Sequence, residues 1–346
     1  MKRSFLALSL AAALLLGVLA GCGPAATEES PTPETAAPTS EPPAETAVPV
    51  PTVRFGVLNG PTGVGAAGLT ALWESAATYN NYEIEVYTDN SQVAAGLTSG
   101  SIDIAAMASN TAATLYNNSD GAVRMVAVSG LGVLYILENG DTVQSLADLE
   151  GRTLYATGQG ANPEYVLNYL LTENGVDPAQ VDIQWRTADE ITTLMVSGEA
   201  ELCMLPVPAA TAVQLQNPDV REALDLSAEW DALQNGSRLT MTVLVARTEY
   251  IEENPDTVAA FLADYQEAVD YVTGQPAEAA QVVAELGITP NAKIAEAAIP
   301  KCALVCVTGA SEMRGAIQGY YEVLYQANPD SIGGIMPDDP FYYEAE

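Results

Sequence analysis

Apolar and polar positions alternate along residues 53–138 in a way that predicts a series of strands and helices. Short apolar segments rich in β-branched residues are separated by longer, helix-favouring segments with alanine and leucine. The short segments predict strands at 53–58, 83–88 and 102–107, and the longer ones predict helices at 65–79, 91–99 and 111–117. Residues 123–138 continue as an apolar run with glycine at its centre. This order is typical of a parallel sheet with helices on both faces.

The same order recurs in the next hundred residues, so we expect a second lobe. Strands are predicted at 153–156, 181–185 and 200–205, and helices at 163–174, 189–197 and 209–216. A further strand at 238–247 lies where the chain would return to the first lobe. Beyond it, Asn254, Pro255 and Asp256 open a long amphipathic helix that reaches Thr273. Helices at 278–286 and 311–326 follow, and we expect all three to pack on the first lobe.

The first residues predict export. Lys2 and Arg3 precede an apolar run at 5–19, as in a secretory signal. Leu19 to Cys22 resembles the lipobox of bacterial lipoproteins, in which residues 1–21 are removed and Cys22 becomes the lipidated N-terminus. The alternative is an ordinary signal peptide with a cysteine there by chance. A lipidated Cys22 would hold the protein on the outer face of the cytoplasmic membrane, at the cell surface or in the periplasm.

Composition then divides the rest of the chain. Residues 22–52 are rich in Pro, Thr, Ala and Glu and lack the apolar side chains needed for a core, so they predict a disordered tether. The remaining domains are expected as follows: lobe 1 (first part) at 53–138, lobe 2 at 139–238, and the hinge return with the second part of lobe 1 at 239–346.

Charge and residue usage exclude several classes of protein. The sequence has 12 basic and 45 acidic residues. Without Lys2 and Arg3, 10 basic and 45 acidic residues remain, which gives a net charge of −35. Nucleic acid and anionic lipid are therefore not expected as partners, and contact with the membrane is expected through the lipid anchor only. The sequence has no histidine, the usual general base and zinc ligand. No metal, cofactor or catalytic residue is predicted.

Two glycine-rich loops are candidate ligand contacts. Each follows a predicted strand and opens a helix, where free backbone N–H groups can bind a small polar or anionic ligand. The first loop supplies Asn59, Pro61, Thr62 and Gly63; the second supplies Gly158, Gly160 and Asn162. The alternatives are a tight turn chosen for packing in the first loop and a simple helix cap at Asn162.

Other candidates follow strand ends, because ligands of open α/β sheets bind outside the carboxyl ends of the strands. Ser109, Asn110 and Thr111 follow the strand at 102–107, although Ser or Asn there can also act as a helix cap. Pro206 and Val207 follow the strand at 200–205. Ser129 lies near the proposed hinge.

The same first loop also contains a dinucleotide-binding pattern. Gly63, Gly65 and Gly68 spell GxGxxG after a strand, with Asp89 further on. An extra turn at Gly60, export from the cell and the lack of a matching feature in the second lobe argue against a bound dinucleotide.

The arginines bear on the charge of a ligand held in a cleft between the two lobes. Arg54, Arg124 and Arg152 begin strands and should point away from this cleft. Arg186 is then the one cation expected near it, which favours a neutral or zwitterionic ligand.

Two stretches carry a resemblance to a known family: SLADLEGRTLYATG at 145–158 and EYIEENPDTVAAFLADYQEAVDYV at 249–272. With the lipobox and the GPTG loop, the chain resembles the type II solute-binding proteins of ABC importers over residues 53–343. The branch it is similar to binds nitrate, taurine, sulfonates or thiamine-precursor pyrimidines. This resemblance implies two doubly wound α/β lobes joined by two crossing strands, best matched by 128–137 and 239–246.

The resemblance also implies a function. The protein would be a monomer that captures a small sulfonate, pyrimidine or amino-acid-like solute in the cleft and passes it to an ABC permease and its ATPase. It would not be an enzyme, since the chain lacks histidine and a GxSxG elbow. Two alternatives stay open: an enzyme related to pyrimidine synthesis, and a ligand sensor on the cell surface.

Overall fold

The protein is described by a computed structural model for residues 50–345. The predicted signal peptide at 1–21, the lipidation site Cys22 and the predicted tether as far as residue 49 lie outside the described residues. Within residues 50–345, no helix has both the length and the apolar character that crossing a bilayer requires.

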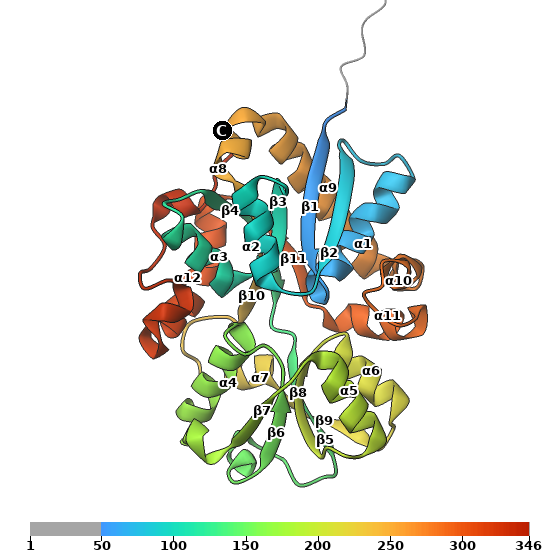
Figure 1. Ribbon diagram of the computed structural model, residues 1–346, viewed down its shortest axis with the longest axis vertical. Helices are drawn as coiled ribbons and strands as arrows, with labels where there is room; N and C mark the ends of the chain where they lie inside the picture. The colour runs from blue at the N-terminus through green and yellow to red at the C-terminus, as the bar shows by residue number, and fades with distance from the viewer. Residues whose placement is uncertain (1–49, 346) are drawn as a thin grey trace, which may run out of the picture. The chain divides into compact units, whose positions relative to one another are not determined.

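The first lobe is built on a six-stranded sheet with the order β11-β4-β10-β3-β1-β2 (Figure 1). Its strands are β1 (Thr52–Leu58), β2 (Asn81–Tyr87), β3 (Ile104–Ala108), β4 (Val123–Leu131), β10 (Thr240–Arg247) and β11 (Leu304–Val307). β1 pairs in parallel with β2 and β3, whereas β10 runs antiparallel to β3 and β4. The sheet is therefore mixed, and the predicted parallel arrangement holds for its first three strands.

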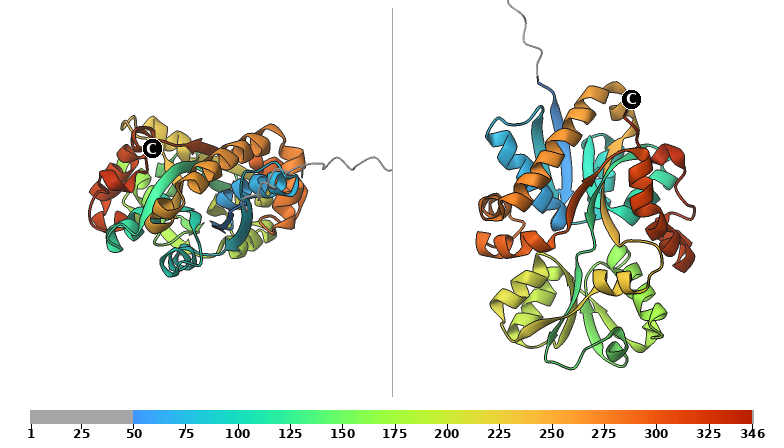
Figure 2. Two further views of the ribbon diagram at one scale, coloured as in Figure 1. Left: turned by 90° about the horizontal axis from the view of Figure 1, so that it is seen from above. Right: turned by 180° about the vertical axis from the view of Figure 1, so that it is seen from behind.

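Helices cover both faces of this sheet. α2 and α3 lie on the face toward the viewer in Figure 1, and α9 runs across the opposite face, which Figure 2 shows from behind. The helices of this lobe are α1 (Pro61–Glu74), α2 (Asn90–Ser99), α3 (Ser109–Asn118), α8 (Thr248–Glu253), α9 (Pro255–Gly274), α10 (Pro276–Glu285), α11 (Ala292–Ala298) and α12 (Ala310–Ala327). The long helix predicted from Asn254 is confirmed as α9.

The glycines of the GxGxxG pattern serve the packing of α9 on α1. A Cβ atom on Gly68 would lie 2.4 Å from the Ala268 carbonyl oxygen, and one on Gly65 would lie 2.6 Å from the Tyr265 hydroxyl. One turn before Tyr265 on the same face of α9, the Phe261 ring packs edge-on against Phe55 with centroids 5.2 Å apart. Close approach of two helices thus accounts for these glycines without a nucleotide.

The second lobe has a five-stranded sheet with the order β7-β6-β8-β5-β9. Its strands are β5 (Leu134–Asn139), β6 (Thr153–Ala156), β7 (Asp182–Trp185), β8 (Leu202–Pro206) and β9 (Val220–Asp225). Its helices are α4 (Asn162–Glu173), α5 (Ala188–Ser197), α6 (Ala209–Gln216) and α7 (Leu226–Ala232). β6 is parallel to β7 and β8, and β5 is antiparallel to β8 and β9.

Short 3-10 turns complete the connections. They lie at Leu146–Leu149, Pro178–Gln180, Ile299–Lys301, Pro329–Ile332 and Asp339–Phe341.

The chain crosses between the sheets twice. Gly132 and Val133 separate β4 from β5, so the apolar run at 128–137 forms the end of one strand and the start of the next. The stretch at 239–246 forms most of β10 and pairs with β3 and β4 inside the first sheet. The chain returns from the second sheet through residues 233–239, which join α7 to β10. Residues 50–345 nevertheless belong to one compact unit.

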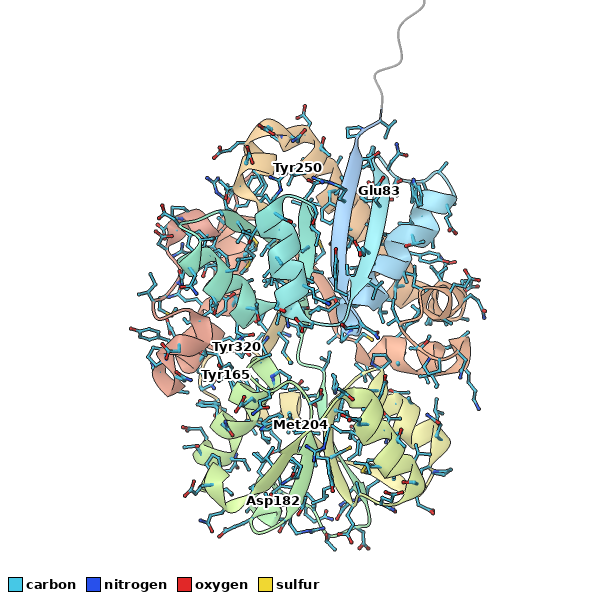
Figure 3. The ribbon with its side chains drawn as sticks, viewed as in Figure 1. Glu83, Tyr165, Asp182, Met204, Tyr250 and Tyr320 are labelled. Carbon is cyan, nitrogen blue, oxygen red and sulfur yellow. The ribbon has the colours of Figure 1, made fainter. Side chains whose placement is uncertain are left out.

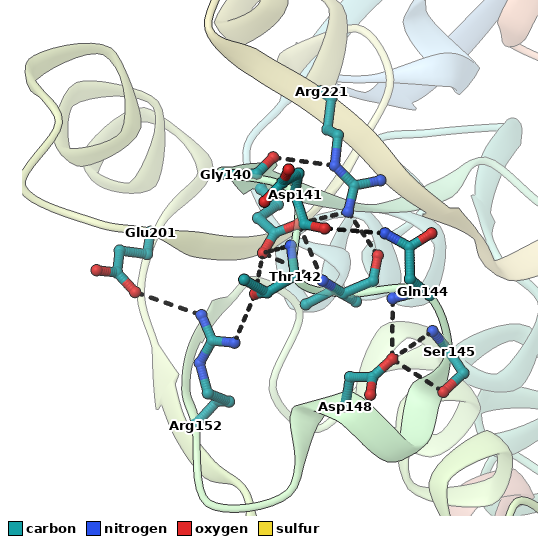
Figure 4. A network of polar contacts seen from close by, with 11 residues as sticks. Gly140, Asp141, Thr142, Gln144, Ser145, Asp148, Arg152, Glu201 and Arg221 are labelled. Carbon is teal, nitrogen blue, oxygen red and sulfur yellow. Dashed lines mark hydrogen bonds and ion pairs between the residues drawn. The ribbon is translucent and has the colours of Figure 1, made fainter.

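The buried carboxylate of Glu138 organises the connection between β5 and β6. Figure 4 shows the polar contacts of this connection, with Thr142 and Arg221 labelled. Glu138 accepts hydrogen bonds from the backbone N–H of Thr142 at 3.0 Å and from its hydroxyl at 2.6 Å, and it pairs with Arg221 at 2.5 Å. Burial alone would raise the pKa of Glu138, but the hydrogen bonds from Thr142 and Val143 and the Arg221 contact outweigh it and lower that pKa. This network fixes the far end of β5, away from the crossing.

Candidate ligand-binding cleft

In the loop between β1 and α1, some polar groups are bonded within the loop and others lie at its surface. The Thr62 hydroxyl donates to the Leu58 carbonyl at 2.8 Å and accepts from the Leu58 N–H at 3.0 Å, so it is engaged inside the loop. Gly63 is buried, and a Cβ atom there would lie 2.9 Å from the Ile288 side chain. Asn59 is exposed and Gly60 half-buried. The loop therefore presents Asn59 and Gly60, rather than Thr62 and Gly63, to its surroundings.

A cavity of about 150 Å³ lies where this loop faces the second lobe. The first lobe contributes Asn59, Gly60 and the segment around Ile288 to Ile294. The second lobe contributes the start of α5 and the junction of β8 with α6. The lining residues are Asn59, Gly60, Ala188, Asp189, Thr192, Pro206, Val207, Pro208, Ala209, Ala212, Gln216, Ile288, Thr289, Pro290 and Ile294. The structure thus brings three predicted residues, Asn59, Pro206 and Val207, to one cavity.

The cavity wall is mainly apolar, with a few polar groups. Its single ionisable side chain is that of Asp189, in the first turn of α5. The N-terminal cap of α5 is made by Thr187 and Glu190 and not by Asp189. The Glu190 carboxylate accepts from the Thr187 N–H and hydroxyl, both at 2.9 Å. Among the described residues, the Asp189 carboxylate has no hydrogen-bond or ion-pair partner. A largely apolar pocket with a few convergent polar groups is the usual form of a small-molecule site.

A second contact between the lobes is a buried hydrogen-bond network around Asn162. Its side-chain amide donates to the Ser109 hydroxyl at 3.1 Å and to the Met241 carbonyl at 2.7 Å, and its carbonyl accepts from the Tyr320 hydroxyl at 3.0 Å. Burial raises the pKa of Tyr320, so its hydroxyl stays protonated as a donor. Figure 3 shows Tyr320 and Tyr165 where α12 meets α4. The predicted residues Ser109 and Asn162 meet, but they bond to each other.

A helix cap is the alternative role of Asn162. It is instead the first residue of α4, after the N-cap Ala161, and its side chain makes no cap hydrogen bond. The cap interpretation is therefore wrong, because the amide is used across the lobes.

The remaining predicted residues do not line the cavity. Asn110 is buried and donates to the Ser331 carbonyl at 3.3 Å, and the Ser129 hydroxyl donates to that of Thr242 at 3.2 Å. Gly158 packs against Pro163, while the Gly160 N–H donates to the Glu164 carboxylate at 2.6 Å. Pro61 and Thr111 are half-buried. In the second glycine-rich loop, the backbone N–H of Gly160 is therefore already used by the Glu164 carboxylate.

Arg54, Arg124 and Arg152 lie outside the cavity lining, as predicted, but Arg186, which was expected near the ligand, does not line the cavity either. Arg54 pairs with Asp103, Arg124 with Glu252 and Arg152 with Glu201, all at a distance from the cavity lining. Arg186 is exposed and donates to the Trp185 carbonyl at 2.7 Å. Within residues 50–345, no lysine or arginine lines the cavity.

One ion pair joins the lobes directly. Lys301 lies just before β11 of the first lobe, and its Nζ is 2.7 Å from the Glu222 carboxylate on β9 of the second. The same ammonium group lies 5.3 Å from the centre of the Tyr135 ring on β5. Together with the Asn162 network, this contact holds the two lobes against each other on either side of the crossing segments.

The sequence analysis did not predict Gly60 or three further parts of the lining: the start of α5, the start of α6 with Pro208, Ala209, Ala212 and Gln216, and the segment from Ile288 to Ile294. The start of α5 follows the carboxyl end of β7, so the rule that pointed to Pro206 could also have pointed to Ala188 and Asp189. The segment from Ile288 to Ile294 offered no such signal, because it reaches the cavity through the packing of α10 and α11.

Comparisons with known proteins extend this description. The model of a family described as NMT1/THI5 like matches residues 81–279. A putative binding protein of Brucella abortus (strain 2308) is 21% identical over 214 residues, which cover 62% of this chain. The matched region spans 64% of the length of that curated relative. A second Brucella protein, a putative binding protein of Brucella suis biovar 1, matches to the same extent.

Several solved structures share the fold. An ABC transporter structure from Parabacteroides distasonis has a TM-score of 0.71 at 22% identity, covering 85% of this chain and 99% of that one. The periplasmic aliphatic sulphonate binding protein SsuA from Escherichia coli has a TM-score of 0.66 at 18% identity, covering 81% and 94%. The periplasmic nitrate-binding protein NrtA from Synechocystis PCC 6803 has a TM-score of 0.52 at 14% identity, covering 68% and 66%. The fold is that of a type II periplasmic binding protein.

Proposed function

The chain belongs to the NMT1/THI5-like family, and from this membership we propose that it captures a small organic solute between its lobes and delivers it to an ABC importer. The observation that carries the proposal is the cavity that both lobes line. Its walls follow the carboxyl ends of β1, β7 and β8. In open α/β sheets, these ends are where ligands bind.

The way the lobes are connected supports capture by closure. Only two short segments, Gly132–Val133 and residues 233–239, carry the chain from one sheet to the other. Hinged lobes that meet around a ligand are a common arrangement in periplasmic binding proteins. A solute in the cavity would touch Asn59 of the first lobe and Pro206 of the second at the same time, which favours the closed arrangement.

The cellular setting is part of the same proposal. Residues 1–22 combine a secretory signal with a lipobox-like end, which supports export and a lipid anchor at Cys22. The protein would then act as a monomer on the outer face of the cytoplasmic membrane, beside an ABC permease and its ATPase. The solute classes to consider are sulfonates, pyrimidines and amino-acid-like compounds.

An enzyme of the related pyrimidine-synthesis type is the second candidate. Such an enzyme would need a histidine, and the full sequence has none. Solved structures of similar fold include the aliphatic sulphonate binding protein SsuA and the nitrate-binding protein NrtA. Solute binding is thus the better supported of the two functions.

A thermal-unfolding screen tests the proposal. The chain is melted alone and with sulfonates, pyrimidines and amino acids, and the solute is recovered afterwards and analysed by mass spectrometry. A true solute at a hundredfold excess over its Kd should stabilise the fold by about 2.7 kcal/mol and be recovered unchanged. A solute that is chemically converted would favour the enzyme, and the failure of all three classes to stabilise the chain would contradict the proposal.

A further inference from the structure

The electrostatic character of the cavity allows the solute class to be narrowed. Asp189 is the only ionisable side chain in the wall, and the rest of the lining is apolar or neutral. Resting on the proposed function, we infer that Asp189 is a specificity-determining residue and that the cavity selects a cationic or hydrogen-bond-donating neutral solute over an oxyanion.

The side chains that would hold an oxyanion are elsewhere. Most basic residues of the described chain are held in ion pairs away from the cavity. Lys293 adjoins the lining residue Ile294 in the sequence, and Arg186 is two residues from Ala188. Both are exposed, as is Arg238, and none of the three lines the cavity. An anion in the cavity would therefore face a carboxylate without a compensating side-chain cation.

Four helices, α1, α5, α6 and α11, begin at the cavity, and the positive ends of their dipoles must be weighed against Asp189. At the start of α11, the Ile294 N–H already donates to the Asn291 side chain at 3.1 Å. α5 carries Asp189 and Glu190 in its first turn, so two carboxylates offset its own dipole. α1 begins at Pro61, and α6 is capped by Pro208. A proline has no N–H to donate, so each of these two helices lacks one of the backbone donors that bind anions at helix starts.

The unpaired state of Asp189 completes the inference. The carboxylate is exposed and has no partner among residues 50–345, whereas one carboxylate oxygen of its neighbour Glu190 is used in the helix cap. A cationic or N–H-bearing group of the solute would supply the missing partner, and hydrogen bonds to an ionised carboxylate are stronger than those between neutral groups. The net charge of the chain, −33, adds a long-range field of the same sign.

Three ring compounds of similar size test the inference. Benzylamine is a cation at pH 7, benzyl alcohol is neutral and benzenesulfonate is an anion; a cavity of about this volume can hold a benzene ring. Isothermal titration of the full chain should give a Kd for benzylamine at least about tenfold lower than that for benzenesulfonate, with benzyl alcohol between them. Equal or tighter binding of benzenesulfonate would overturn the inference, as would no binding of any of the three.

Substitutions of Asp189 test whether this residue causes the charge selectivity of the cavity. Asp189→Asn should weaken benzylamine binding by about tenfold and leave benzyl alcohol within about twofold. Asp189→Lys should reverse the order of benzylamine and benzenesulfonate. Glu199→Gln, which removes an exposed charge of the same lobe outside the cavity, is the control and should change neither ratio. An unchanged ratio in Asp189→Asn would overturn the assignment.

The outcomes also separate this inference from the proposed function. Thr192 lines the cavity, so Thr192→Trp should block it for every solute. If benzenesulfonate binds the unaltered chain tightly and Thr192→Trp abolishes that binding, the charge selectivity is wrong and solute capture stands. If Thr192→Trp leaves binding intact, the cavity is not the site and both fail.

Discussion

Single buried polar residues set much of the local structure, and Glu138 is the clearest case. Its side chain is 1% exposed, yet it accepts several hydrogen bonds and pairs with Arg221. Such a carboxylate is stabilising only while it is ionised and its partners are in place. The loop from Gly140 to Val143 therefore depends on the charge of one residue.

This arrangement predicts a pH dependence. The pKa of Glu138 is lowered in the folded state, so its contribution is fully present above the unfolded pKa and is lost as pH falls through the lower folded value. Glu138→Gln should cost about 3 kcal/mol at pH 7, measured by urea unfolding. The cost should shrink as the pH is lowered through the acid range.

The control for this prediction is Glu201→Gln. Glu201 pairs with Arg152 at 3.3 Å, but its side chain is largely exposed, so its loss should cost less than about 1 kcal/mol. If Glu138→Gln were as mild as Glu201→Gln, or if its cost were the same at acid pH, the role assigned to Glu138 would be wrong.

At the scale of elements, the Asn162 network joins α4 of the second lobe to α3, β10 and α12 of the first. Asn162→Ala removes three hydrogen bonds and leaves the Tyr320 hydroxyl and the Met241 carbonyl unpaired inside the protein. The expected cost is about 2 to 3 kcal/mol in the free energy of unfolding, because buried groups without partners are costly.

Asn168 offers a matched control on the same helix. Its side chain makes no hydrogen bond within the described residues and is half-buried, so Asn168→Ala should change stability by less than about 0.5 kcal/mol. Equal urea midpoints for Asn162→Ala and Asn168→Ala would contradict the interlobe role of Asn162.

The sequence predicted those elements whose apolar pattern is strong. β1, β3, β8 and α9 have buried apolar faces and were placed close to their true bounds. β9 and β11 were missed because most of their residues are only half-buried, so their apolar pattern is weak, and β11 is also short. The antiparallel direction of β5 and β10 could not be predicted, since it depends on where the chain crosses between sheets.

The candidate site was predicted less completely. The rule that ligands bind at strand ends found Pro206 and Val207, and the glycine-rich loop pointed to Asn59. The same two arguments also selected Asn110 and Thr62, and the proposed hinge selected Ser129; the side chains of these three residues are turned inward to partners within the first lobe. A sequence pattern locates the end of a strand, but the direction of each side chain is decided by packing with elements far away in the chain.

At the scale of the whole molecule, the proposed capture of a solute requires two lobes that share one cavity. The lobes contact each other through the Asn162 network and the Lys301–Glu222 ion pair. The cavity is lined by other residues of both lobes. We therefore expect solute binding to depend on the shape of this cavity, and loss of its volume to abolish binding without unfolding the chain.

Two neighbouring threonines of α5 allow the most direct measurement of this central claim. Thr192 lines the cavity, whereas Thr193 is exposed and does not. Isothermal titration with a solute found in the thermal screen should show that Thr192→Trp abolishes binding while Thr193→Trp keeps the Kd within about twofold, both variants melting close to the unaltered chain. Retained binding in Thr192→Trp, or an equal loss in both variants, would contradict a solute site between the lobes.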